Sequence, residues 1–447
     1  MKNILSIIII FICIFTFSCN AIARTKTIGE KNMTIEDVRK QDRVLDYFIQ
    51  LAQIPSPSLK EEKVAGKIIE ILSSKGINVQ KDNYGNVIAK LDANNSDKAP
   101  ILLSAHMDVV GSDTPVNIRV SSDGKYLETD KKRTLGADDK AGVALILDVL
   151  SYFKEHPEIS HPMIEAVFTR DEENGMSGVH NLDTSLIVSQ NALMLDGSDL
   201  GDCNISGAGF TNLTVKVTDG KSGHSGNDIG DETRISANKV LAEIINEIPQ
   251  GVYKKDKFGV VTSINSGAII GGSTGLYLLN EKDIEKLEDA NAIMNQIADK
   301  AFRNIIASNA YVNYSIRSSE PDNENKLKQE ISNKVDNIAK KYKGNIKINY
   351  TFETHVPPFV KVCDDAFLDI IIAAAKKNGM NTNPSSFHAA AETHVLQNEK
   401  LNKDGKNFKP LLLGVANILN MHSSDEKLDY QSLITGRNWV IDIILSE

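Results

Sequence analysis

The chain has 447 residues, of which 41% are hydrophobic and 24% are charged. This is the composition of an ordinary globular protein, and its length exceeds what one hydrophobic core usually serves, so we expect two domains. The formal net charge of -9 excludes a general role in nucleic-acid binding, because no basic stripe offsets it.

The first segment has the pattern of a secretory signal. A charged start precedes an apolar stretch over residues 4–17, which is short for a membrane span. Cleavage after Ala21-Ile22-Ala23 would make residues 1–23 a signal peptide, and we favour it because the residues before Cys19 make a poor lipobox. We therefore expect an extracytoplasmic protein, periplasmic or secreted. A lipoprotein anchor at Cys19 is the alternative and would attach the chain to a membrane.

Apolar residues in the next part of the chain alternate between helical and strand-like spacing. Helices that alternate with buried strands imply an α/β layer with a largely parallel sheet. The helical spacing predicts helices over 34–54, over a segment that ends near Gly76, and over 141–153. Compact apolar runs predict strands over 86–89, 101–105, 164–169 and 192–195.

The pattern changes near Gly207, where half-exposed strands begin. We expect an α+β unit with a four-stranded sheet and helices on one face. Its predicted strands cover 213–217, 260–264, 311–316 and 346–352, and its helices cover 233–248, 322–342 and a further stretch over 281–306. The α/β pattern returns after Pro357-Pro358, with a helix over 364–378, an apolar run over 410–416 and a last helix over 431–445. We therefore predict one α/β domain (24–209 and 357–447) interrupted by an inserted α+β domain (210–356).

Acidic side chains follow several of the predicted strands. The carboxyl ends of parallel strands meet at one edge of a sheet, so these side chains should converge in one cleft. Carboxylates at close range repel one another, and divalent cations relieve that repulsion. Imidazole with carboxylate suits zinc, with manganese or cobalt as alternatives, and the set is large enough for two ions. The candidate residues of this cleft are one histidine, His106, and the acidic residues Asp108, Asp138, Asp139, Asp171, Glu172, Glu173 and Asp196.

A second ion would require a second histidine. Among the nine histidines, His422 is the best candidate because it follows the apolar run over 410–416. His156 and His161 flank prolines in what reads as a surface loop, and a histidine without a carboxylate partner is usually not a ligand.

The candidate residues of this cleft and His422 lie in five short motifs whose order along the chain resembles that of the M20 metallopeptidases, most closely the peptidase T-like branch. The resemblance covers the chain from about residue 34 to its end. The motifs are His106-Met107-Asp108, Gly136-Ala137-Asp138-Asp139-Lys140-Ala141-Gly142, Asp171-Glu172-Glu173-Asn174-Gly175, Asp196-Gly197 and the late His422. The resemblance implies a zinc-exopeptidase-type catalytic domain, with a ferredoxin-like inserted domain that serves as a lid and forms a homodimer.

The resemblance also implies a role for each site residue. Asp108 would orient the imidazole of His106, and Glu172 would be the general base that activates a metal-bound water. Asp138 is chosen over Asp139 as the bridging ligand from the family pattern, because the chemistry of the residues alone leaves the two open. One zinc would be held by His106 and Asp196, and the other by Glu173 and His422, with Asp138 between them.

Three further residues are candidates for substrate binding. Within Ser222-Gly223-His224-Ser225-Gly226, His224 resembles a histidine that contacts substrate across the family's dimer interface, and this segment is more similar to the aminoacyl-histidine dipeptidase branch. Arg317 fits a clamp on a substrate carboxylate, although a surface arginine at a strand end is the equal alternative. His388 stands where peptidase T carries an Arg-Gly-Gly-Thr-Asp segment, so it would contact substrate or stabilise its loop.

The leading hypothesis is an enzyme that cleaves the first peptide bond of di- and tripeptides. An N-acyl amino-acid amidohydrolase would use the same centre on another substrate. A non-catalytic peptide-binding protein is the third alternative, and it is disfavoured because every residue of the implied catalytic set is present.

Overall fold

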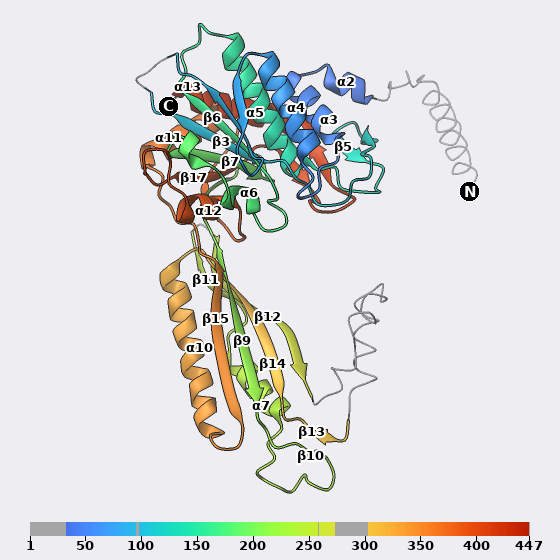
Figure 1. The fold of residues 1–447 in the computed structure, drawn as a ribbon, viewed down its shortest axis with the longest axis vertical. Coiled ribbons are helices and arrows are strands. Elements are labelled where there is room, and N and C mark those ends of the chain that lie inside the picture. Colours follow the sequence, from blue (N-terminus) through green and yellow to red (C-terminus); the bar gives the residue numbers. More distant parts are fainter. Residues whose placement is uncertain (1–32, 95–97, 258, 273–302, 447) are drawn as a thin grey trace, which may run out of the picture.

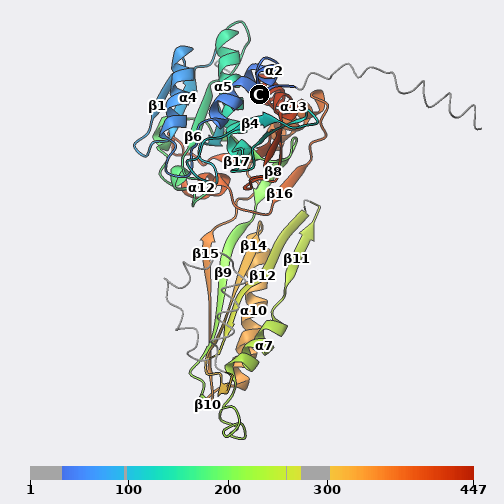
Figure 2. The same ribbon diagram turned by 90° about the vertical axis from the view of Figure 1, so that its right-hand side faces the viewer.

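The computed structural model describes residues 33–94, 98–257, 259–272 and 303–446, and it has two parts (Figure 1). One part contains an eight-stranded mixed sheet, and the other an antiparallel sheet of five strands. The second part projects from one end of the first, as both views show (Figure 2). The predicted signal segment lies outside the described residues, as does most of the helical stretch predicted over 281–306. No helix in the described ranges combines the length and the apolar character that crossing a bilayer requires.

The eight-stranded sheet carries the predicted α/β architecture. Its central strands β6, β3, β7 and β17 run parallel to one another, which confirms a largely parallel sheet. All six residues of β3 are buried, because helices cover both faces of the sheet. In spatial order the strands are β1 (Asn78–Lys81), β2 (Val87–Leu91), β6 (Ile164–Thr169), β3 (Ile101–His106), β7 (Asn191–Gly197), β17 (Lys409–Gly414), β8 (Cys203–Gly207) and β16 (Pro384–Phe387).

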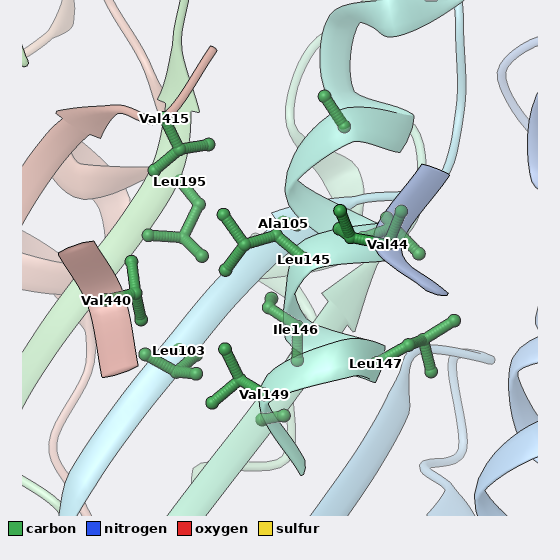
Figure 3. Close-up of a cluster of buried hydrophobic side chains, with 14 of the residues drawn as sticks. Val44, Leu103, Ala105, Leu145, Ile146, Leu147, Val149, Leu195, Val415 and Val440 are labelled. Carbon is green, nitrogen blue, oxygen red and sulfur yellow. The ribbon is translucent and has the colours of Figure 1, made fainter. Parts of the chain in front are cut away.

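Alternate residues of these strands pack into two different hydrophobic clusters. Leu103 joins the larger cluster, where it lies near Val149 of a long central helix (Figure 3), and Leu102 joins the smaller one on the other face. The larger cluster is covered by α3 (Arg43–Ala52), α4 (Glu62–Ser74), α5 (Ala137–Glu155), α11 (Asp365–Lys377) and α13 (Tyr430–Ser446). The smaller cluster is covered by α6 (Ser177–His180) and α12 (Glu392–Glu399).

The helix predicted over 34–54 is in fact two helices, α2 (Ile35–Arg39) and α3. The Asp42 side chain accepts a hydrogen bond of 3.0 Å from the Val44 amide and so caps α3. A new N-cap requires a break in the chain, which hydrophobic spacing alone did not reveal because Val38 and Val44 are both buried in the same cluster.

The inserted part has five strands where four were predicted. The strand that was missed, β11 (Gly251–Asp256), lies at the edge of the sheet and is mostly exposed, so it carries no alternating apolar pattern. Apolar residues from α7 (Ala237–Glu247) and α10 (Pro321–Lys341) pack on the same face of the sheet. The remaining strands, in order from β11, are β12 (Gly259–Gly271), β14 (Ala310–Ser318), β9 (Gly209–Thr218) and β15 (Lys347–Val356).

Two smaller sheets complete the described structure. At the far end of the inserted part, β10 (Gly223–His224) pairs with β13 (Ile305–Ile306) (Figure 1). Beside the eight-stranded sheet, a four-stranded antiparallel sheet runs in the order β18 (Asn417–Leu419), β19 (Lys427–Asp429), β5 (Tyr126–Thr129) and β4 (Ile118–Val120).

A buried carboxylate joins three helices of the α/β domain. Asp148 of α5 is fully buried and pairs with Arg43 of α3 and Arg437 of α13. Replacement of Asp148 with alanine removes these contacts, although Arg43 keeps Glu155 and Arg437 keeps Asp42 as partners. A hydrogen bond to a charged group is worth about 1.5–3 kcal/mol. We expect urea denaturation to show a loss of that size. The exposed pair between Lys60 and Asp113 gives the matched control, Asp113→Ala, which should change stability by less than ~1 kcal/mol. Equal losses in the two variants would contradict this expectation.

Candidate metal centre

The predicted site residues come together at the carboxyl edge of the parallel strands. His106 ends β3, Asp196 lies near the end of β7, and Glu172 and Glu173 follow β6. Asp138 lies in the first turn of α5. His422 follows β18 and has a left-handed backbone with φ of 60°.

The five predicted ligands form two groups that share Asp138. In the first group, His106 Nε2 lies 3.1 Å from Asp138 Oδ1 and 3.5 Å from Asp196 Oδ1. In the second group, His422 Nε2 lies 3.0 Å from Asp138 Oδ2 and 3.1 Å from Glu173 Oε2. Each group thus combines one imidazole, one carboxylate of its own and one oxygen of Asp138.

The electrostatics of this cluster fit divalent cations. Burial raises the pKa of Asp196 to about 6 and that of Glu173 to about 7, and the charge of Asp138 adds to both shifts. Burial also acts on Asp138, but hydrogen bonds with His106 and His422 outweigh it and lower its pKa. Among the described residues, the buried Oε1 of Glu173 has no hydrogen-bond partner. A cation would compensate these crowded carboxylates, so the donor set can hold metal ions.

Asp138 and Asp139 make different contacts. Asp139 also belongs to a possible ligand group with His106 and Asp196. Its Oδ1, however, accepts a 3.0 Å hydrogen bond from the Gly142 amide, and a Cβ at Gly142 would lie 2.5 Å from that oxygen. Asp139 Oδ1 thus supports the first turn of α5, while its buried Oδ2 has no hydrogen-bond partner among the described residues. Asp138 is the carboxylate that contacts both histidines.

Asp108 is not one of the five predicted ligands, but its side chain contacts residues of both ligand groups. His106 Nδ1 is hydrogen-bonded to the Asp108 backbone carbonyl at 3.1 Å, and the carboxylate Oδ1 of Asp108 lies 3.3 Å from the same nitrogen. This Oδ1 accepts a 2.9 Å hydrogen bond from the Glu172 amide. The Oδ2 of Asp108 accepts hydrogen bonds from the Glu173 amide at 3.2 Å and from the Ser58 hydroxyl at 2.7 Å. Asp108 thus contacts the imidazole through its carbonyl and its carboxylate, and the buried carboxylate also holds the loop that carries Glu172 and Glu173.

Sequence reasoning missed Glu426, which supports Asp138 from the opposite side. This buried carboxylate accepts hydrogen bonds from the Gly136 amide at 2.7 Å and the Asp138 amide at 3.3 Å. It also accepts a hydrogen bond from the Thr134 hydroxyl. Its position four residues after His422 was the only signal in the sequence, and the contacts across the fold could not be read from it.

Two of the three predicted substrate-binding residues lie where the two parts of the molecule meet. His388 Nε2 is 2.7 Å from the Ser263 hydroxyl of β12, and Ser263 pairs with Arg317 of β14. The Arg317 guanidinium lies over the Phe210 ring, 4.5 Å from its centroid. His224 does not join them, because β10 lies at the far end of the inserted part (Figure 1).

An α/β domain with paired histidine–carboxylate groups at its carboxyl edge, and an inserted second part, fits the class of metal-dependent hydrolases. Within that class, residues 102–446 match the model of peptidase family M20/M25/M40. The chain belongs to this family, and it is a metallopeptidase.

Two relatives are similar to this chain in sequence. The uncharacterized protein YqjE of Bacillus subtilis strain 168 is 25% identical over 414 residues, which cover 90% of this chain and 98% of that protein. Peptidase T of Geobacillus kaustophilus is 29% identical over 306 residues, covering 58% and 73% respectively.

Two solved structures share the fold. Aminopeptidase PepT from Bacillus cereus has a TM-score of 0.74 at 21% identity and covers 91% of this chain and 98% of its own. Aminoacylhistidine dipeptidase from Vibrio alginolyticus has a TM-score of 0.65 at 19% identity, covering 94% and 99%.

Proposed function

We propose that the chain is a di-zinc exopeptidase that hydrolyses the N-terminal peptide bond of di- and tripeptides. The observation that carries this proposal is the pair of histidine–carboxylate groups that share Asp138, with Glu172 on the loop beside them. The names of the relatives, peptidase T above all, support peptides as the substrate class.

Each residue at the centre has a proposed task. His106 and Asp196 would hold one ion, Glu173 and His422 the other, and Asp138 both. When bound, the ions lower the pKa of water and polarise the scissile carbonyl group.

Glu172 accepts a proton from the attacking water and returns it to the leaving amine. Burial raises the pKa of Glu172 well above its usual value; His106 opposes this shift, while Asp196 and Glu392 add to it. A raised pKa suits a carboxyl group that must both take up and release a proton near neutral pH.

A panel of substrates with metal analysis tests the proposal. The purified protein should release the first residue from di- and tripeptides and hold two ions per chain, with zinc, manganese and cobalt compared after chelation. Cleavage of N-acetyl amino acids but not of peptides would replace the proposal with a deacylase. Peptide binding without turnover in added zinc would indicate a binding protein instead.

We propose that Arg317 binds the C-terminal carboxylate of the substrate. Among the described residues no carboxylate forms an ion pair with it, and its guanidinium lies over the Phe210 ring, near enough to His388 for its charge to act there. A hydrogen bond to a charged group is worth roughly 1.5–3 kcal/mol, so Arg317→Ala should raise KM for tripeptides about 10–150-fold.

The control for this prediction lies in the substrate. A C-terminally amidated tripeptide lacks the carboxylate, so its KM should be nearly the same with the unmodified protein and with Arg317→Ala. Arg317→Lys should recover part of the loss, because lysine keeps the charge without the two-pronged geometry. An equal rise in KM for the free and the amidated peptide would contradict the clamp.

Two further proposals concern the whole protein. Because His224 lies far from the metal centre of its own chain, we propose a homodimer through the inserted part, in which a second copy would bring this histidine to the site. Sedimentation equilibrium tests this proposal.

We also propose an extracytoplasmic location, because the first residues are similar to signal peptides. Cell fractionation tests this proposal.

A further inference from the structure

Glu392 is a buried carboxyl group that the proposed reaction does not use. It opens α12 and is 1% exposed. Its Oε2 accepts a 2.8 Å hydrogen bond from the Thr169 hydroxyl, and its Oε1 has no hydrogen-bond partner among the described residues. A buried polar group with an unused oxygen is costly, so its presence beside the centre calls for an explanation.

Thr169, the hydrogen-bond partner of Glu392, lies close to both His106 and Glu172 in the chain and the sheet. Thr169 is fully buried, ends β6, and stands three residues before Glu172. It pairs with His106 in the register of β3 and β6, and its carbonyl accepts a 2.8 Å hydrogen bond from the Met107 amide. One hydrogen bond therefore connects the start of α12 to the strand ends that carry both His106 and Glu172.

α12, the helix that Glu392 begins, is anchored by hydrophobic packing. Val395 and Leu396 of α12 are buried in the smaller hydrophobic cluster together with Leu412 of β17. The loop before α12 carries His388, which reaches Ser263 of the inserted part. The start of α12 thus lies where the two parts of the molecule meet (Figure 1), held on one side by packing and on the other by Thr169.

We propose that Glu392 is a positioning residue for hydrolysis: by accepting the Thr169 hydrogen bond, it fixes the end of β6 and thereby the place of Glu172. The charged groups that act on it are His106 and Asp108 from the β3 end, Asp196 from β7 and Glu172 from the loop after β6. Burial raises the pKa of Glu392. Glutamine keeps the shape of this side chain and an acceptor oxygen for the Thr169 hydroxyl, so it is a fair mimic.

The test compares variants that keep or remove the hydrogen bond. Glu392→Gln keeps an acceptor oxygen, so kcat for a tripeptide should stay within about 3-fold of the unmodified protein, since the bond persists. Glu392→Leu removes the acceptor and should lower kcat about 10–100-fold with KM nearly unchanged, because misplacement of a catalytic group acts on the rate. The metal content of both variants should equal that of the unmodified protein.

Thr169 provides a second pair in case Glu392→Leu fails to fold. Thr169→Val should reproduce the loss in kcat, and Thr169→Ser, which restores the hydroxyl, should recover it. Loss of activity in Glu392→Gln equal to that in Glu392→Leu would overturn the proposal, because it would show that the charge matters and not the hydrogen bond. Full activity of Glu392→Leu and Thr169→Val would overturn it as well.

This inference rests on the proposed function for its rate measurement. Peptide turnover by the unmodified protein is therefore established first, so that a failure of the proposed function is seen before any variant is compared.

Discussion

Replacement of Glu172 with glutamine is expected to lower kcat for di- and tripeptides by about 10²–10⁴-fold, the usual contribution of a general base. The amide cannot accept the proton of the attacking water. Its backbone contact with Asp108 does not involve the side chain, so the loop should keep its place. The measurement is steady-state hydrolysis at saturating substrate, together with metal analysis of the same sample.

The neighbouring carboxylate gives a matched control for this variant. Glu173 Oε2 lies 3.1 Å from His422 Nε2, so Glu173→Gln should weaken metal binding at the second group. Glu172→Gln should instead retain the full metal content and lose only the rate. Full activity of Glu172→Gln would contradict the proposed mechanism, and loss of metal from it would show that Glu172 is a ligand.

The sequence predicted the α/β domain well because its strands are buried on both faces. β3 and β6 are continuous apolar runs between helical segments, and such runs leave few alternatives. β11 was missed for the opposite reason, since an exposed edge strand needs no apolar pattern. The break between α2 and α3 was missed because residues of both helices, Val38 and Val44 among them, are buried in the same hydrophobic cluster.

Some residues of the candidate site could likewise be predicted from the sequence, and others could not. His106, Asp138, Glu172–Glu173, Asp196 and His422 could be predicted because each lies at a strand end or a helix start, in a recognisable motif. Glu392 and Glu426 could not, because their contacts with Thr169 and Asp138 join residues more than 200 positions apart in the chain. A glutamate in a sequence gives no sign of burial, and only the fold shows that these two are inside.

Asp108→Ala is expected to weaken metal binding about 10–100-fold, the usual cost of removing a carboxylate that orients a metal-binding histidine. Burial raises the pKa of Asp108, but hydrogen bonds with His106, Ser58 and the Glu172 amide outweigh it, so the pKa is lowered and the group is ionised at neutral pH. Its charge acts on the imidazole together with the Asp108 backbone carbonyl, which lies 3.1 Å from His106 Nδ1 and remains in Asp108→Ala. The dissociation constant for zinc, measured by competition with a chelating dye, checks the expected loss.

The same substitution should also lower kcat when metal is saturating. Asp108 accepts hydrogen bonds from the amides of Glu172 and Glu173, and without it the loop that carries the general base loses both anchors. This second loss distinguishes Asp108 from a residue that only orients His106. Ser58→Ala removes one hydrogen bond to Asp108 and leaves these two in place, so its kcat should stay within about 3-fold of the unmodified protein. A wild-type kcat for Asp108→Ala in excess zinc would show that Glu172 is held by the rest of its loop, where the Asp171 amide donates a 3.1 Å hydrogen bond to Glu61.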